Sequence, residues 1–264
     1  GDARKKFFHY KLYNWPSLSI AIENLIKTPN RISKNYVSNL SSQAKTLSGI
    51  EYLLFNDNIS TINKGFVKSE KRMNYLKWVV FFHKERTKEL LNLWSKSGEN
   101  YAEKFINKEG NSINSSINKL YNGVHNVIST AKISKIGKSA GLEKSENINL
   151  DELQAKYSGY SKELLIENLE ISKKIFFNNN GLGLSNYIKE ITGDEKLNTL
   201  FKIKIEATLE NLYNLKNSLA ITIKKNPKEL ITIHNQLQEL IILLTVDIRS
   251  SLSIVITRTD NDGD

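Results

Sequence analysis

The sequence of 264 residues contains no cysteine and only three prolines. The absence of cysteine excludes thiol nucleophiles, cysteine-ligated zinc and disulfide bonds. The scarcity of proline leaves long stretches of chain free to form uninterrupted helices. Long hydrophobic runs are missing too: the run around Leu240–Val246 is far shorter than the roughly 20 apolar residues that a membrane-spanning helix needs. We therefore expect no transmembrane segment.

The residues that are abundant are leucine, isoleucine, asparagine, lysine and serine, and few glycines interrupt the periodic segments. This composition suits long helices joined by polar loops, so we predict an all-α protein. The length is sufficient to bury a sizeable core, as one large or two small domains.

The net charge of +10 raises nucleic acid as a partner. The lysines, however, are spread along every segment beside glutamate and aspartate. Lys132, Lys135 and Lys138 form a modest basic row, with no aromatic side chains between them on which bases could stack. A solvated helical surface explains this charge better, and we expect no nucleic-acid partner.

The spacing of apolar residues predicts the order of the helices along the chain. A short helix follows Trp15-Pro16 and ends before Pro29, and a second lies in the stretch of residues 41–57. Asn56–Gly65 is expected to be a polar loop, followed by one long helix over 68–108 and another over 112–133. The second half is predicted to hold helices at 162–178, 184–191 and 194–216, and a last helix from Pro227 whose apolar stripe ends at Leu252.

Residues 134–150 are the predicted domain boundary, because two glycines and a polar run interrupt the helical period there. We assign residues 1–136 to a first helical domain and residues 137–264 to a second. His83, His125 and His234 lie beside apolar blocks without a second ligand at helical spacing, and we interpret them as structural. By pattern alone, the acidic end at Asp260–Asp264 is a solvated tail.

Glu51 is the most informative residue of the chain. It lies on the same helical stripe as Leu47, Ile50 and Leu54, where a carboxylate is costly to bury without a partner. One hypothesis is a structural ion pair with an arginine or lysine of a neighbouring helix. The other is that Glu51 faces a cleft and binds a ligand. Ser48, one turn earlier, could donate a hydrogen bond to whatever Glu51 holds.

Residues 47–55 read Leu-Ser-Gly-Ile-Glu-Tyr-Leu-Leu-Phe. This string resembles the signature of the imelysin-like family, Gly-x-His-x-x-Glu followed by Tyr-Leu-Leu-Phe. Glu51 matches the signature glutamate, and residues 52–55 match its continuation. Thr46 stands in the position of the glycine and Ser48 in that of the histidine. The loss of the histidine removes the strongest argument for a transition-metal site.

Further signatures occur in the order in which the family has them. They are Trp15-Pro16 before the glutamate, Lys-Ile-Gly-Lys at residues 135–138 in the linker, the segment from Ser158 to Leu169, and Asp-Gly-Asp at residues 262–264. We expect that the helices which the family has before Trp15 are missing here. Since the chain begins with Gly1 and not methionine, we expect that an upstream segment has been removed.

The resemblance implies two helical bundles related by approximate internal symmetry, with a cleft shared between them. It also implies export to the periplasm or outer-membrane surface, often as a lipoprotein, and a link to iron uptake. Its ligand-binding residues, carried over to this sequence, are Ser48, Glu51, Ser158, Ser161, Asp262 and Asp264, with Glu51 as the metal ligand. Such oxygen ligands suit a hard cation such as Fe³⁺ or Ca²⁺ better than zinc.

Three functions follow as hypotheses. The first is a non-enzymatic binding protein of iron or haem uptake, which works with an outer-membrane partner. The second is a peptidase, as the family was first described, although the sequence has no His-Glu-x-x-His helix and lacks the motif histidine. The third is a surface interaction module in which Glu51 only joins two helices. The identity of the ligand stays open.

Overall fold

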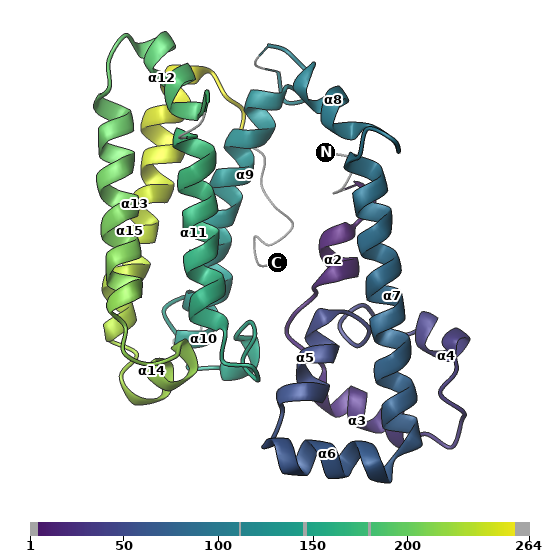
Figure 1. Cartoon of the computed structure of the whole chain (residues 1–264). Coiled ribbons are helices and arrows are strands. Elements are labelled where there is room, and N and C mark those ends of the chain that lie inside the picture. Colours follow the sequence, from purple (N-terminus) through teal and green to yellow (C-terminus); the bar gives the residue numbers. More distant parts are fainter. Residues whose placement is uncertain (1–4, 111, 145–146, 179–180, 257–264) are drawn as a thin grey trace. The chain divides into compact units, whose positions relative to one another are not determined.

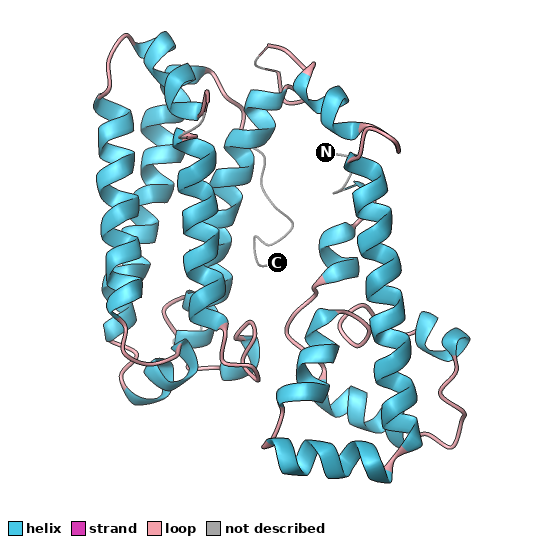
Figure 2. Cartoon of the chain, in the orientation of Figure 1, coloured by secondary structure: helices cyan, strands magenta, loops and turns pink. Residues whose placement is uncertain are grey.

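The computed structural model describes residues 5–256 except 111, 145–146 and 179–180. Every regular element in these residues is a helix and none is a strand, which confirms the all-α prediction (Figure 2). The approximate internal symmetry stays a prediction. In this part of the chain, no helix is both long and apolar enough to cross a membrane.

Contacts within the chain divide it into two compact units (Figure 1). Unit 1 comprises Gly1–Lys104 together with Gln154–Ser158, and unit 2 comprises Phe105–Leu153 and Gly159–Asp264. The boundary expected from the sequence, between residues 136 and 137, therefore falls inside unit 2. Unit 1 instead includes a short segment that lies 50 residues beyond its main part in the sequence.

Unit 1 is a set of short helices around one long helix. Its helices are α2 (Phe8–Leu12), α3 (Ser19–Lys27), α4 (Lys34–Ser38), α5 (Leu47–Phe55), α6 (Ile59–Lys68) and α7 (Glu70–Trp94), and α8 (Tyr101–Ile106) crosses into unit 2. Buried apolar side chains from α3, α4, α5, α7 and the loop before α4 form its core: Ile22, Ile26, Ile32, Val37, Leu53, Tyr75 and Val79.

Two sequence predictions in unit 1 are wrong. Residues 59–68 form helix α6 and not a loop, because the Asn58 side chain accepts a hydrogen bond from the Thr61 N–H and caps the helix. The predicted helix over 68–108 is divided into α7 and α8. Asn100, which lies between them, has a positive φ of 50°, and an α-helix cannot continue through that conformation.

Unit 2 is a bundle of long helices. Its elements are α9 (Ser116–Thr130), the π-helix η1 (Ala131–Gly137), α10 (Lys138–Ala140), the 3₁₀ turn η2 (Leu150–Glu152), α11 (Ser161–Phe177), α12 (Leu184–Thr192), α13 (Lys196–Asn214), α14 (Leu219–Lys225), α15 (Glu229–Ile242), the π-helix η3 (Leu243–Ile248) and α16 (Arg249–Leu252). Helices α9, α11, α13 and α15 contact one another in a closed ring, as in a four-helix bundle.

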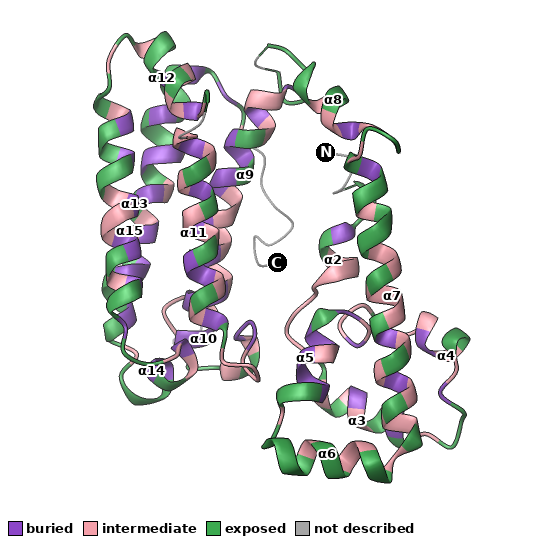
Figure 3. Ribbon diagram, viewed as in Figure 1, coloured by how far each residue is buried: buried purple, intermediate pink, exposed green. Residues whose placement is uncertain are grey.

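The apolar faces of these four helices meet in one continuous core (Figure 3). Phe176 on α11 and Phe201 on α13 are fully buried, and their rings stack with centroids 3.8 Å apart. The stripe predicted for the last helix is confirmed at its buried positions: Leu230, Ile233, Leu237, Leu240, Leu244, Ile248 and Leu252.

The predicted break at residues 134–150 begins later than expected. Helical structure continues from α9 through η1 and α10 to Ala140, and it ends at Gly141, where φ is 68°. Gly137 has an ordinary helical conformation, with φ −58° and ψ −56°, and a Cβ there would lie 2.5 Å from Glu143 Cγ. A close approach, not a turn, therefore explains this glycine.

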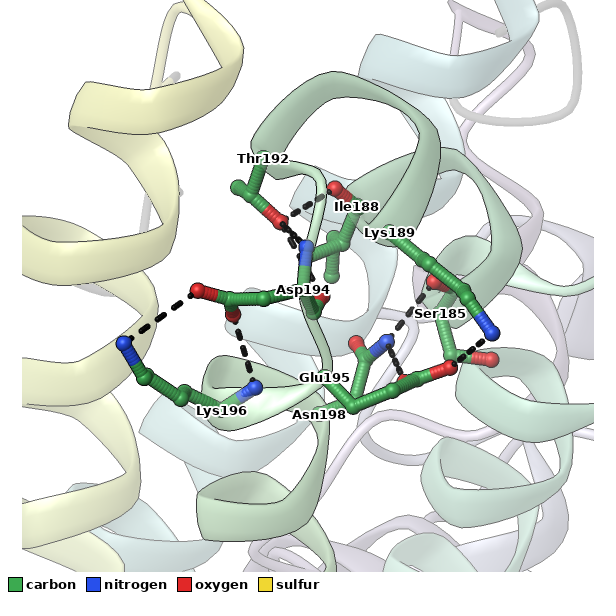
Figure 4. A network of polar contacts seen from close by, with 8 residues as sticks. All are labelled: Ser185, Ile188, Lys189, Thr192, Asp194, Glu195, Lys196 and Asn198. Atoms are coloured by element: carbon green, nitrogen blue, oxygen red, sulfur yellow. Dashed lines mark hydrogen bonds and ion pairs between the residues drawn. The ribbon is translucent and has the colours of Figure 1, made fainter.

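The turn between α12 and α13 shows how polar side chains complete a helix junction (Figure 4). Gly193 supplies a φ of 77°, and the Thr192 hydroxyl donates to the Ile188 carbonyl. The Asn198 side chain donates to the Ser185 carbonyl and to Glu195 Oε2. Lys189 forms an ion pair with Glu195, and Lys196 forms one with Asp194. These contacts join the end of α12 to the start of α13.

Candidate functional site

Glu51 lies in helix α5, and its side chain holds the segment 154–158. Glu51 Oε1 accepts hydrogen bonds from the backbone N–H groups of Tyr157 (3.0 Å) and Ser158 (2.8 Å). The hydroxyl of Ser158 donates to the same oxygen at 3.0 Å. The partners expected for a structural Glu51 were cationic side chains of a neighbouring helix. The partners found are three neutral donors on a segment that begins more than 100 residues later.

The second carboxylate oxygen of Glu51 remains open. Among the described residues, no hydrogen bond or salt bridge reaches Oε2, and this atom is not sealed from solvent. Tyr13 lies close enough to be affected by the charge: burial, followed by the negative charge of Glu51, raises the pKa of the Tyr13 phenol. Glu51, which is itself 9% exposed, thus uses one oxygen to position the chain and leaves the other without a partner among the described residues.

The segment held by Glu51 has a strained backbone. Ala155 has a φ of 53°, in the left-handed region that a side chain with a Cβ rarely adopts, and it is buried. Such a conformation costs on the order of 1 kcal/mol or more and persists only where the surroundings enforce it. The three hydrogen bonds to Glu51 begin two residues later, so this carboxylate is part of what enforces it.

The two residues that depart from the family signature act together on the chain at Asn14. The Asn14 N–H donates to Thr46 Oγ1 at 3.2 Å, and the Ser48 hydroxyl donates to the Asn14 carbonyl at 2.6 Å. Both side chains are almost fully buried. Thr46 and Ser48 therefore hold the peptide groups on both sides of Asn14. The Ser48 hydroxyl, which was expected to donate to whatever Glu51 holds, thus donates to the backbone of Asn14.

Comparison with known families decides the classification. The imelysin family model matches residues 2–245, which is most of the chain. The chain belongs to the imelysin family. The comparison with curated proteins gives no match.

A solved structure shows the same fold as this imelysin chain. It is a crystal structure described as that of an iron-regulated protein A precursor from Parabacteroides distasonis. The two structures superpose with a TM-score of 0.68 at 20% sequence identity, and the match covers 93% of this chain and 75% of the other.

The other residues expected at the imelysin ligand site have different positions. Ser158 lies against Glu51. Ser161 belongs to unit 2, where it is the buried first residue of α11. Asp262 and Asp264 lie outside the described residues. Within the described part of the chain, no three histidine, aspartate or glutamate side chains are grouped closely enough to hold a metal ion.

A pocket beside the Glu51 segment contains residues that sequence reasoning missed. Its volume is about 380 Å³, and its lining includes Glu23, Tyr52, Asp57, Arg72 and Tyr157. The Tyr52 ring meets the Tyr157 ring edge-on at 5.1 Å. Burial, followed by the hydrogen bond to Glu23, raises the pKa of Tyr52 to about 12. The sequence placed Tyr52 in the family signature but gave no sign of Glu23 or Arg72, which come from separate helices.

The histidines interpreted as structural have local partners or are buried. His234 Nε2 contacts Glu143 Oε1 at 2.9 Å, and His125 contacts Ser129 at 3.3 Å. For His83, burial lowers the pKa, although a hydrogen bond with the Leu12 backbone opposes that effect.

Proposed function

We propose that this imelysin-family chain is a binding protein of iron or haem acquisition that works outside the cytoplasm with an outer-membrane partner. The observation that carries the proposal is that the two carboxylate oxygens of Glu51 differ in their contacts. One oxygen is held by three neutral donors, while no hydrogen bond or ion pair from a described residue reaches the other. A buried carboxylate needed only for structure would more often be neutralised by a cationic partner.

The ligand atoms that we propose start from Glu51 Oε2. The Ser158 hydroxyl lies against the same carboxylate, and Ser161, Asp262 and Asp264 are the further oxygen donors that the family signature implies. Ser48 takes a positioning role, because its hydroxyl is engaged with Asn14. A set of this kind consists of hard oxygen donors and suits Fe³⁺ or Ca²⁺.

The described residues fit complexed iron better than a bare ion. They offer one open carboxylate oxygen here and no grouping of three carboxylates or histidines. Haem or a ferric chelate brings most of its own ligands, so a single protein oxygen can complete or orient the complex. The fold shared with the iron-regulated protein from Parabacteroides distasonis supports our proposal of a ligand that contains iron.

Calorimetric titration tests the proposal. We expect haem or ferric citrate to bind the wild-type chain, and we expect Glu51→Gln to weaken binding at least tenfold. The amide keeps an acceptor for Tyr157 and Ser158 but removes the charge. Glu85→Gln is the control, because Glu85 is an exposed carboxylate on α7 paired with Lys88. Equal affinities in all three proteins would refute the role of Glu51.

A second assay addresses the peptidase hypothesis directly. Purified protein is incubated with casein, with and without a chelator. We expect no cleavage, because Ser48 occupies the position of the motif histidine and is committed to Asn14. Chelator-sensitive cleavage would replace the binding function with a peptidase function.

A further inference from the structure

The pocket in unit 1 contains an ion pair with unused hydrogen-bonding capacity. Arg72 Nη2 donates to Glu23 Oε1, and the Tyr52 hydroxyl donates to the same oxygen at 2.9 Å. Within the described residues, no hydrogen bond is made by Arg72 Nη1 or Nε, or by Glu23 Oε2, and none of these atoms is sealed from solvent. The pair therefore offers a guanidinium edge and a carboxylate oxygen side by side.

The wall around Arg72 is kept open by a glycine inside a helix. Gly65 lies within α6, where alanine would favour the helix by about 1 kcal/mol. Its backbone is in an ordinary helical conformation, so no turn requires glycine. A Cβ at residue 65 would lie 3.7 Å from Arg72 Cδ and 3.8 Å from Nε. The missing side chain thus leaves the Nε edge of the guanidinium uncovered.

The rest of the lining combines one more carboxylate with apolar walls. Asp57 is exposed and accepts hydrogen bonds only from the backbone and side chain of Asn58 among the described residues. Ile62 and the rings of Tyr52 and Tyr157 line the same space, which has a volume of about 380 Å³. This size lies at the lower end of the roughly 300–1,000 Å³ usual for small-molecule sites.

We propose that this pocket binds a free α-amino acid with an apolar side chain. The ligand's carboxylate accepts from the open edge of Arg72, which suits a planar two-oxygen group. Its ammonium group is held by Asp57 and the free oxygen of Glu23. A carboxylate without an amine would meet these two acidic groups unpaired, and an amine without a carboxylate would meet Arg72. The zwitterion satisfies both charges, and its side chain lies against Ile62 and Tyr157.

This inference goes beyond the proposed function and uses neither Glu51 nor Ser158. The two can therefore fail separately: haem or ferric citrate tests Glu51, whereas amino acids test Arg72. Failure of one titration leaves the result of the other intact.

The test is a calorimetric titration of the full chain with three probes. L-leucine carries both charged groups, L-leucinamide lacks the carboxylate, and 4-methylpentanoate lacks the amine. We expect saturable binding of L-leucine and at least tenfold weaker binding of the other two. Equal binding of either analogue would overturn the proposal, as would the lack of any leucine binding up to about 10 mM, which is weaker than ordinary recognition.

Variants then assign the binding to the pocket. Arg72→Lys keeps the positive charge beside Glu23 but loses the two-oxygen contact, and Asp57→Asn removes one ammonium partner. Each is expected to weaken leucine binding at least tenfold. Arg86→Lys is the matched control, since Arg86 pairs with Glu89 on the exposed face of the same helix. Unchanged affinity in both pocket variants would overturn the assignment.

Gly65→Ala provides a readout that a structural role would not give. The substitution favours the α6 helix, so the melting temperature should be equal to or higher than that of the wild type. The added methyl group narrows the pocket beside Arg72, so leucine binding should fall. Retained binding in this variant would contradict the proposed position of the ligand's carboxylate.

Discussion

Glu51 in unit 1 and Glu143 in unit 2 each gather several donors on one oxygen, but the donors differ in charge. Glu51 Oε1 accepts three bonds from neutral groups of Tyr157 and Ser158. Glu143 Oε1 contacts Lys132 Nζ at 2.7 Å and His234 Nε2 at 2.9 Å. Cationic side chains of its own unit thus balance the charge of Glu143, whereas among the described residues no cationic side chain forms an ion pair with Glu51. The contrast agrees with a structural role for Glu143 and with the ligand-binding role that we propose for Glu51.

The cores of the two units also differ, both in size and in the length of the helices that form them. Unit 2 buries one continuous set of apolar side chains between four long helices, and its Lys132 and His234 side chains both pair with Glu143. Unit 1 has a smaller core built from short helices around α7. Its partly buried groups Glu23, Arg72 and Glu51 retain unused donors or acceptors. Binding capacity is accordingly expected in unit 1, and structural rigidity in unit 2.

The largest expected loss of stability comes from removing Glu143, which pairs with Lys132 and His234. Glu143→Ala leaves the buried ammonium of Lys132 without its partner, and we expect a loss of about 3 kcal/mol in the free energy of unfolding. Denaturant unfolding followed by circular dichroism measures it. Glu206→Ala is the control, because Glu206 is an exposed partner of Lys173. A loss no larger than in the control would show that the cluster contributes little.

A smaller loss is expected from Glu51→Ala. Removal of the carboxylate leaves the N–H groups of Tyr157 and Ser158 without an acceptor, which should cost about 1–3 kcal/mol. Thermal melts should show a fall of about 2–4 °C per kcal/mol for a chain of this size. Glu51→Gln, which keeps an acceptor, should recover part of the loss. A neutral or stabilising Glu51→Ala would instead show that Glu51 is held against a cost in stability for the sake of a ligand.

Two glycines on the continuous helical stretch from α9 to η1 are expected to respond to alanine substitution in opposite ways. Gly137→Ala places a Cβ 2.5 Å from Glu143 Cγ and 2.8 Å from the Lys132 carbonyl, and should cost about 1–3 kcal/mol through overpacking. Gly123→Ala has no atom within 4 Å and should stabilise α9 by about 0.5–1 kcal/mol. Opposite signs in urea unfolding are expected. The same sign in both would mean that Glu143 moves aside freely.

The smallest effect is the pH dependence of the Glu143 cluster. Burial raises the pKa of Glu143, but hydrogen bonds from Lys132 and His234 outweigh it and hold the pKa below its usual value. Because the folded pKa is the lower one, this stability is present above the unfolded pKa of about 4.3 and is lost as the pH falls through the folded value. The loss should be smaller than in Glu143→Ala, since a protonated carboxyl still accepts hydrogen bonds.

Unfolding curves between pH 6 and pH 3 measure this dependence. The wild type should lose more stability over the acid range than Glu143→Gln, which cannot titrate at this position. If the free energy of unfolding changed with pH in the same way in both proteins, titration of Glu143 would make no contribution to the pH dependence.

The helical class and most helix positions could be predicted from the amino-acid sequence alone. The spacing of Leu230, Leu237 and Leu244 predicted a long buried stripe because helical periodicity is a local property of neighbouring residues. The family signature likewise identified Glu51 from nine consecutive residues. Local patterns predicted the secondary structure less well where a helix cap determined where a helix begins. Asn58 begins helix α6 inside a stretch that composition alone had predicted to be a loop.

The contacts that these residues make could not be predicted from the sequence, because they depend on how the helices pack. The donors to Glu51 lie 106 and 107 residues further along the chain, and Thr46 and Ser48 hold a peptide more than 30 residues earlier. Glu23, Tyr52 and Arg72 come from three helices. Such partners depend on how helices pack and not on the sequence around any one of them. The same carboxylate on the same apolar stripe could have met a lysine, and in unit 2 a carboxylate did.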